Sequence, residues 1–134
     1  MDLKKAMKVY EETNLSTMPM IGYVLLLLKE CLYNVRNCGI AVEENEIDQR
    51  NKSVSKAQKL LFELMTVTDR RTVEGERLFT YYAYLNQCLV EVRINESDEH
   101  LKKVEQALLE MIASWEVARP LTREEGYMGR EIRL

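Results

Sequence analysis

The sequence offers few of the residue types that carry catalysis or hold a metal. It contains one histidine, His100, and three cysteines, Cys31, Cys38 and Cys88, in 134 residues. A Ser-His-Asp or Cys-His arrangement would have to use His100, which stands in a charged turn at the start of a predicted helix. A di-iron site in a helical bundle needs a Glu-x-x-His motif, and the residue three positions before His100 is Ser97. We therefore expect no catalytic residue, no metal ligand and no cofactor, and we do not expect an enzyme.

The three cysteines are expected to be buried, reduced thiols. Cys31 and Cys38 are seven residues apart in a predicted helix, which separates them by about 10 Å along the helix axis. That distance is too long for a disulfide. A zinc site needs close cysteine pairs or several histidines, and the sequence has neither. Buried free cysteines are typical of a cytoplasmic protein.

The composition indicates a soluble, mostly helical domain. Hydrophobic residues make up 46% and charged residues 31% of the chain, and there are only five glycines and two prolines. The net charge of −3 argues against nucleic-acid binding, which requires a basic face. The most apolar stretch, residues 18–28, is 11 residues long, whereas a membrane span needs about 20. The charged N-terminus lacks the apolar region of a signal peptide, so we expect a cytoplasmic protein without membrane insertion.

Four stretches carry apolar residues at alternating steps of three and four, the spacing of an amphipathic helix. They cover residues 17–42, 48–69, 73–94 and 98–118. Thr72 and Ser97 are the expected N-caps of the last two helices, and Pro120 ends the fourth. The polar first turns of the second helix, residues 49–52, predict an end that protrudes or frays. Because the connections are short, the expected fold is all-α, an antiparallel up-down four-helix bundle with an N-terminal arm or short helix.

We expect one domain over residues 1–134. It divides into an arm (1–15), the bundle (16–119) and a tail (120–134). Leu108 and Trp115 lie on the apolar stripe of the last helix and are predicted to be core residues. Replacing Trp115 by alanine is then expected to cost about 3–5 kcal/mol of stability.

The first half of the first helix is apolar nearly all round, whereas a bundle helix needs to bury only about half of its circumference. Three explanations stay open: the N-terminal arm covers the excess, the helix is central, or a partner helix binds in a hydrophobic groove. Methionine and tyrosine suit such a surface because they tolerate irregular or half-wet contacts. The side chains expected to contact a client are Tyr10, Met18, Met20, Tyr23, Val24, Leu27, Tyr81 and Tyr84.

The arm carries Leu3, Met7 and Tyr10 at helical spacing, next to this apolar surface. We expect it to lie over part of the client surface and to be displaced by the client. A direct contact between the arm and the client is the alternative, because apolar spacing does not distinguish a lid from a clamp.

Four features, in this order, match a known family. They are Tyr10 before the Ser16–Pro19 turn, a leucine-rich helix, a Lys-Ala-Gln to Glu-Leu-Met helix over residues 56–65 closed by Asp69, and a tyrosine-bearing third helix followed by a last helix with Trp115. Over residues 8–118 the chain thereby resembles the flagellin-specific flagellar export chaperone family (FliS-like).

The resemblance implies a cytoplasmic flagellar secretion chaperone. It implies binding to the C-terminal segment of flagellin, prevention of premature polymerisation, and delivery to a component of the flagellar export gate. Without its client the protein would be a monomer or a homodimer. The alternative from a different class is a structural or regulatory helical-bundle adaptor, which uses the same apolar face as a homodimer seam or for another client.

Overall fold

The structure is a computed structural model that describes residues 18–118. This part of the chain forms four α-helices: α2 (Met18–Glu43), α3 (Ile47–Thr66), α4 (Val73–Asn95) and α5 (Asp98–Ala118). The all-α prediction is confirmed. The predicted arm (1–15) and tail (120–134) lie outside the described residues, so the division of the domain into three parts stays a prediction.

Capping residues set two of the helix starts as expected. The Thr72 side chain accepts a hydrogen bond from the Gly75 N–H at the start of α4, and the Ser97 hydroxyl accepts one from the His100 N–H at the start of α5. The end of α3 was predicted wrongly, at Asp69. The helix ends at Thr66 because the next turn tightens, and the Thr68 hydroxyl donates to the Leu64 carbonyl in place of a backbone N–H.

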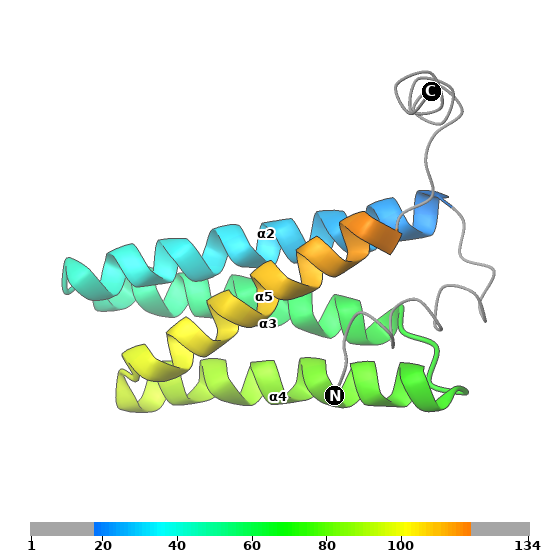
Figure 1. Ribbon diagram of the computed structural model, residues 1–134. Helices are drawn as coiled ribbons and strands as arrows, with labels where there is room; N and C mark the ends of the chain where they lie inside the picture. The colour runs from blue at the N-terminus through cyan, green and yellow to red at the C-terminus, as the bar shows by residue number, and fades with distance from the viewer. Residues whose placement is uncertain (1–17, 119–134) are drawn as a thin grey trace, which may run out of the picture.

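The four helices alternate in direction (Figure 1), and the contacts between them close a ring. α2 packs against α3 and α5, and α4 packs against the same two helices. α2 and α4 are therefore diagonal partners, and the same holds for α3 and α5. Figure 1 shows α5 inclined across the bundle, from the end of α4 towards the start of α2. Two ion pairs, Lys29–Glu116 and Arg36–Glu105, join α5 to α2 along this line.

The core lies where the apolar stripes of the four helices meet. Leu108 and Trp115 are 0% and 1% exposed, which confirms their assignment to the core. All three cysteines are buried and free, also as predicted. Burial raises the pKa of the Cys31 thiol to about 12 and that of Cys38 to about 11, so both stay protonated and unreactive at neutral pH.

The first turns of α3 do not protrude or fray, contrary to the sequence prediction. Arg50 is 7% exposed, and its guanidinium donates to the Arg93 carbonyl of α4 at 3.2 Å. The same guanidinium pairs with Glu96 at 3.0 Å, in the connection between α4 and α5. A polar residue usually indicates an exposed position, but arginine can be buried when its donors are satisfied.

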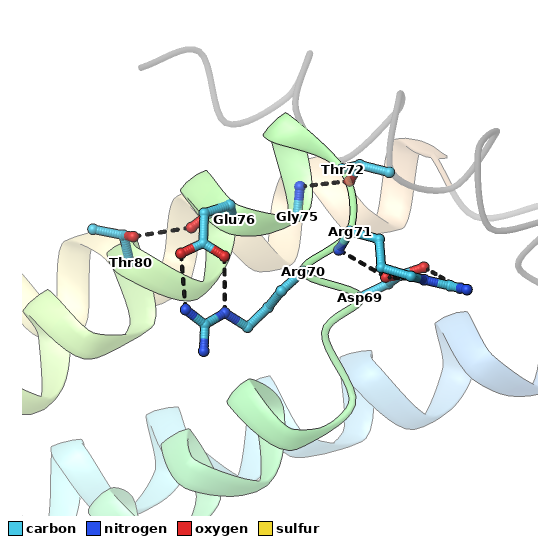
Figure 2. Close-up of polar contacts among 7 residues, drawn as sticks. All are labelled: Asp69, Arg70, Arg71, Thr72, Gly75, Glu76 and Thr80. Carbon is cyan, nitrogen blue, oxygen red and sulfur yellow. Dashed lines mark hydrogen bonds and ion pairs between the residues drawn. The ribbon is translucent and has the colours of Figure 1, made fainter.

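The connection between α3 and α4 is held by local polar contacts (Figure 2). Arg70 donates two hydrogen bonds to the Glu76 carboxylate, at 2.8 and 2.9 Å, and its guanidinium lies 3.8 Å from the centre of the Phe79 ring. Asp69 accepts from the backbone and the guanidinium of Arg71. These contacts fix the first turn of α4 relative to the end of α3.

Candidate functional site

The N-terminal half of α2 divides into core and surface residues. Val24 and Leu27, two of the expected client contacts, are 4% and 6% exposed and belong to the core cluster. Met20 and Tyr23 remain on the surface, at 39% and 37% exposed. Most of the apolar excess that the sequence shows in this half of the helix is therefore used inside the bundle. Tyr10 and the side chain of Met18 lie outside the described residues.

Tyr23 is fixed across the contact line, or seam, between α2 and α3. Its hydroxyl donates to the Glu63 carboxylate of α3 at 2.6 Å. This hydrogen bond is the main cause that raises the pKa of Tyr23 above its usual value, so the hydroxyl keeps its proton. Met20 is one turn earlier on the same flank of α2, because residues three apart are neighbours on a helix surface.

Tyr81 and Tyr84 of α4 form a second aromatic surface, which we call the tyrosine patch. Their ring centres are 6.1 Å apart, with the planes tilted by 36°. Tyr84 is 47% exposed, and Tyr81 packs partly against the core. A pocket of about 290 Å³ is lined by Glu76, Arg77, Thr80, Tyr81 and Tyr84.

The tyrosine patch faces α5. Burial is the main cause that raises the pKa of Tyr81, and the Glu110 carboxylate of α5 adds to it. A hydrogen bond with Cys88 is the main cause that raises the pKa of Tyr84, while Lys103 of α5 acts in the opposite direction. Neither phenol ionises near neutral pH, so both present a neutral aromatic ring with a hydroxyl able to donate.

The structure brings the predicted contacts together in pairs and not in one groove. Met20 and Tyr23 lie at the α2/α3 seam, whereas Tyr81 and Tyr84 lie on the α5 side of α4. In the ring of helices these are opposite sides of the bundle. A single straight helix lying in one groove does not reach both.

Sequence reasoning missed an exposed apolar row on α2. Leu26, Tyr33 and Ile40 are 55%, 63% and 52% exposed. They are seven residues apart, so they lie above one another on a single face of the helix. We call them the α2 ridge. Their regular spacing was visible in the sequence, but it merged with the wider apolar pattern of the core.

The described residues hold no arrangement suited to metal binding. Within residues 18–118, no group of three or more His, Cys, Asp or Glu side chains could hold a metal ion. The His100 ring is hydrogen-bonded to the Ser97 hydroxyl at 2.6 Å, at the cap of α5. In the same part of the chain, no helix is long and apolar enough to cross a membrane.

The fold and the surface define a class: an up-and-down helical bundle with a closed core and exposed apolar side chains suited to contacts with other proteins. The family model described as Flagellar protein FliS matches residues 3–122. This chain therefore belongs to the FliS family, as the resemblance in the sequence implied.

A curated relative agrees with this assignment. The flagellar secretion chaperone FliS of Bacillus subtilis (strain 168) is 23% identical over 118 residues, which is 88% of this chain and 89% of the relative. Family membership and this relative together support a role as a flagellar secretion chaperone. The family is one of chaperones and not of enzymes.

Proposed function

We propose that this chain binds the C-terminal segment of flagellin in the cytoplasm, prevents its premature polymerisation and assists its export. It acts by binding and not by catalysis. One observation carries the proposal: apolar and aromatic side chains are exposed on two opposite sides of a bundle whose core is already closed. They are free to bind a client without opening the bundle.

The chemistry of an unfolded client fits this surface. A segment that folds on binding loses conformational entropy at that moment, and it needs a large contact area to compensate. An extended segment can reach both sides of the bundle, which a rigid globular partner cannot. Delivery requires a further contact, which we assign to a component of the export gate.

The test is the stoichiometry of the complex. The purified chain is mixed with a peptide of the flagellin C-terminal segment, and the mass is measured by light scattering after size exclusion. We expect a 1:1 complex, and no complex with a peptide of the same length from the N-terminal segment of flagellin. A mass that doubles with concentration in the absence of peptide, with no binding to it, would favour the homodimer alternative.

We propose further that residues 1–15, anchored by Tyr10, cover part of the client surface until the client displaces them. Deleting residues 1–9 is then expected to leave client binding intact or tighter, because a competitor at high effective concentration has been shortened. Tyr10→Ala is expected to raise self-association of the free protein. Loss of client binding on deletion, with the bundle still folded by circular dichroism, would instead make the arm a direct contact.

A further inference from the structure

We propose that the outer face of α2 and α3 is a docking surface for an amphipathic helix of a partner protein, with acidic residues along one edge of that helix. This inference does not rest on the proposed binding of flagellin.

Three lysines of α3 form a row without partners. Residues 18–118 contain six lysines. Lys29, Lys102 and Lys103 each form an ion pair with a glutamate or aspartate. In contrast, no ion pair or hydrogen bond in the described part of the chain involves the exposed side chains Lys52, Lys56 and Lys59. We call these three the lysine row.

The spacing of the lysine row places its charges on one face. Steps of four and three residues keep the side chains on the same side of a helix, where like charges repel. The repulsion is relieved when carboxylates lie opposite them. Elsewhere on the bundle carboxylates of the chain itself fill this role, as Glu116 does for Lys29. The lysine row therefore has the charge pattern of a surface that meets an acidic partner.

The lysine row lies beside the α2 ridge. A groove of about 290 Å³ is lined by Tyr33 and Ile40 of the ridge together with Lys52 and Lys56 of the row. Asn34 and Ser53, 7% and 8% exposed, are among its other lining residues. The Tyr23–Glu63 hydrogen bond lies further along the same two antiparallel helices and outside the lining of this groove.

The α2 ridge and the lysine row together favour a helix as the partner segment. Leu26, Tyr33 and Ile40 recur every seven residues over about 21 Å, which is the repeat that a second helix matches side chain for side chain. An apolar centre with a charged edge is also the usual build of a protein interface. Glu44 and Glu46 line the groove near the α2–α3 connection, so the acidic residues of the partner belong opposite the lysine row and not beyond it.

A second copy of this chain is a poor occupant of this face. The flank of the ridge away from the lysine row carries Lys29 and Arg36. A two-fold contact through the ridge sets either the lysine row against itself or the lysine row against these two side chains. The first arrangement sets positive charge against positive charge. In the second, Lys29 and Arg36 are already paired with Glu116 and Glu105, so the lysine row still meets no free carboxylate, and neither arrangement is favoured.

The first experiment uses a synthetic helical peptide as the probe. It has leucines at a seven-residue repeat and glutamates along one edge, and its matched control has lysines in place of those glutamates. Fluorescence anisotropy with the full-length chain at low salt is expected to show binding of the acidic peptide at least about tenfold tighter than of the basic one. Added salt is expected to reduce the difference, because exposed charges are screened. Equal affinities for the two peptides would overturn the proposal.

Matched variants then locate the binding site. Lys52→Glu/Lys56→Glu and Lys102→Glu/Lys103→Glu change the net charge equally, but only the first pair lies on the proposed surface. We expect the first double variant to lose the preference for the acidic peptide and the second to keep it. Tyr33→Ser/Ile40→Ser is expected to weaken both peptides, with the fold checked by circular dichroism. If both lysine variants behave alike, the attraction is one of overall charge and the proposed surface is wrong.

A competition experiment separates this surface from the client site. A flagellin C-terminal peptide is added to the chain already bound to the acidic probe. Retention of the probe supports a separate docking surface. Displacement of the probe would show that the face belongs to the client site, which contradicts a second partner and leaves the proposed function standing.

Discussion

Gly75 stands where the α3–α4 connection leaves no room for a side chain. A Cβ built there would lie 1.8 Å from the Asp69 carbonyl oxygen and 2.9 Å from the Thr72 hydroxyl oxygen. Because the first of these atoms belongs to the backbone, the connection has to move. We expect Gly75→Ala to lower the free energy of unfolding by about 1–3 kcal/mol, measured by urea denaturation.

Gly22 provides the matched control for that measurement. It lies in α2, and no described heavy atom comes within 4 Å of a Cβ built at this position. Gly22→Ala is therefore expected to raise stability by about 0.5–1 kcal/mol, through the better helix propensity of alanine. A gain at both positions would show that the close approach at Gly75 is relieved at no cost.

Asp69 gives the fold a defined response to acid. The Arg71 side chain and backbone N–H donate to its carboxylate and lower its pKa from the usual 3.8 to about 2. The folded state therefore favours the ionised form, and the carboxylate contributes stability above about pH 4 that is lost as the pH falls through 2. We expect Asp69→Asn to melt with a smaller change between about pH 5 and pH 2 than the unmodified chain.

Melting curves by circular dichroism across that range check this expectation. Asp48→Asn is the control, because no hydrogen bond or ion pair of the described residues involves the Asp48 side chain. An Asp69→Asn variant with an unchanged pH profile would show that the contacts with Arg71 do not favour the folded state.

At the scale of the helices, Arg50 joins α3 to the end of α4 and to the connection that follows. Its guanidinium bonds the Arg93 carbonyl and the Glu96 carboxylate, and Glu96 has a left-handed backbone with φ of 52°. Arg50→Ala removes the donors from a buried site, so we expect a loss of about 1–3 kcal/mol in urea denaturation.

The control for Arg50 is an arginine with an exposed partner. Arg36 pairs with Glu105 on the surface, and both side chains are more than one-third exposed. Arg36→Ala is therefore expected to change stability by about 1 kcal/mol or less. If the two variants lose equally little stability, the buried contacts of Arg50 contribute no more to the free energy of unfolding than a surface ion pair does.

Helix starts were predictable from the sequence because capping is local. Thr72 and Ser97 use their own side chains on the next turn, so the starts of α4 and α5 followed from residue type alone. The end of α3 did not follow from residue type. Thr68 continues the apolar spacing, but its hydroxyl replaces its backbone N–H as the donor to the Leu64 carbonyl. The buried position of Arg50 also depends on α4, which is distant in sequence.

The candidate site was predictable only in part, for a physical reason. Apolar spacing identified the over-apolar start of α2, but it did not separate Val24 and Leu27 in the core from Met20 and Tyr23 on the surface. That separation depends on which two helices flank α2. The same limit explains why the sequence did not show that Tyr81 and Tyr84 lie on a different side of the bundle from the α2/α3 seam, since α2 and α4 are diagonal partners.

At the scale of the whole molecule, the two sides of the bundle make a prediction about how a client binds. If one extended flagellin segment contacts both sides, Met20→Ala and Tyr84→Ala should each weaken binding. Truncation of an exposed interface side chain of this kind costs about 1–2 kcal/mol, or roughly five- to thirtyfold in affinity. Because the two residues lie on opposite sides of the ring, their effects on the binding free energy should add in the double variant.

Titration calorimetry of the four proteins with the flagellin C-terminal peptide makes this comparison, with Ile94→Ala as the control. Ile94 is 69% exposed at the end of α4 and belongs to neither surface, so its truncation should leave the affinity unchanged. A double variant no weaker than one of the single variants would place the client on one side of the bundle. An additive loss with a constant 1:1 stoichiometry requires a client long enough to span both sides, because a single helix in one groove contacts only one of them.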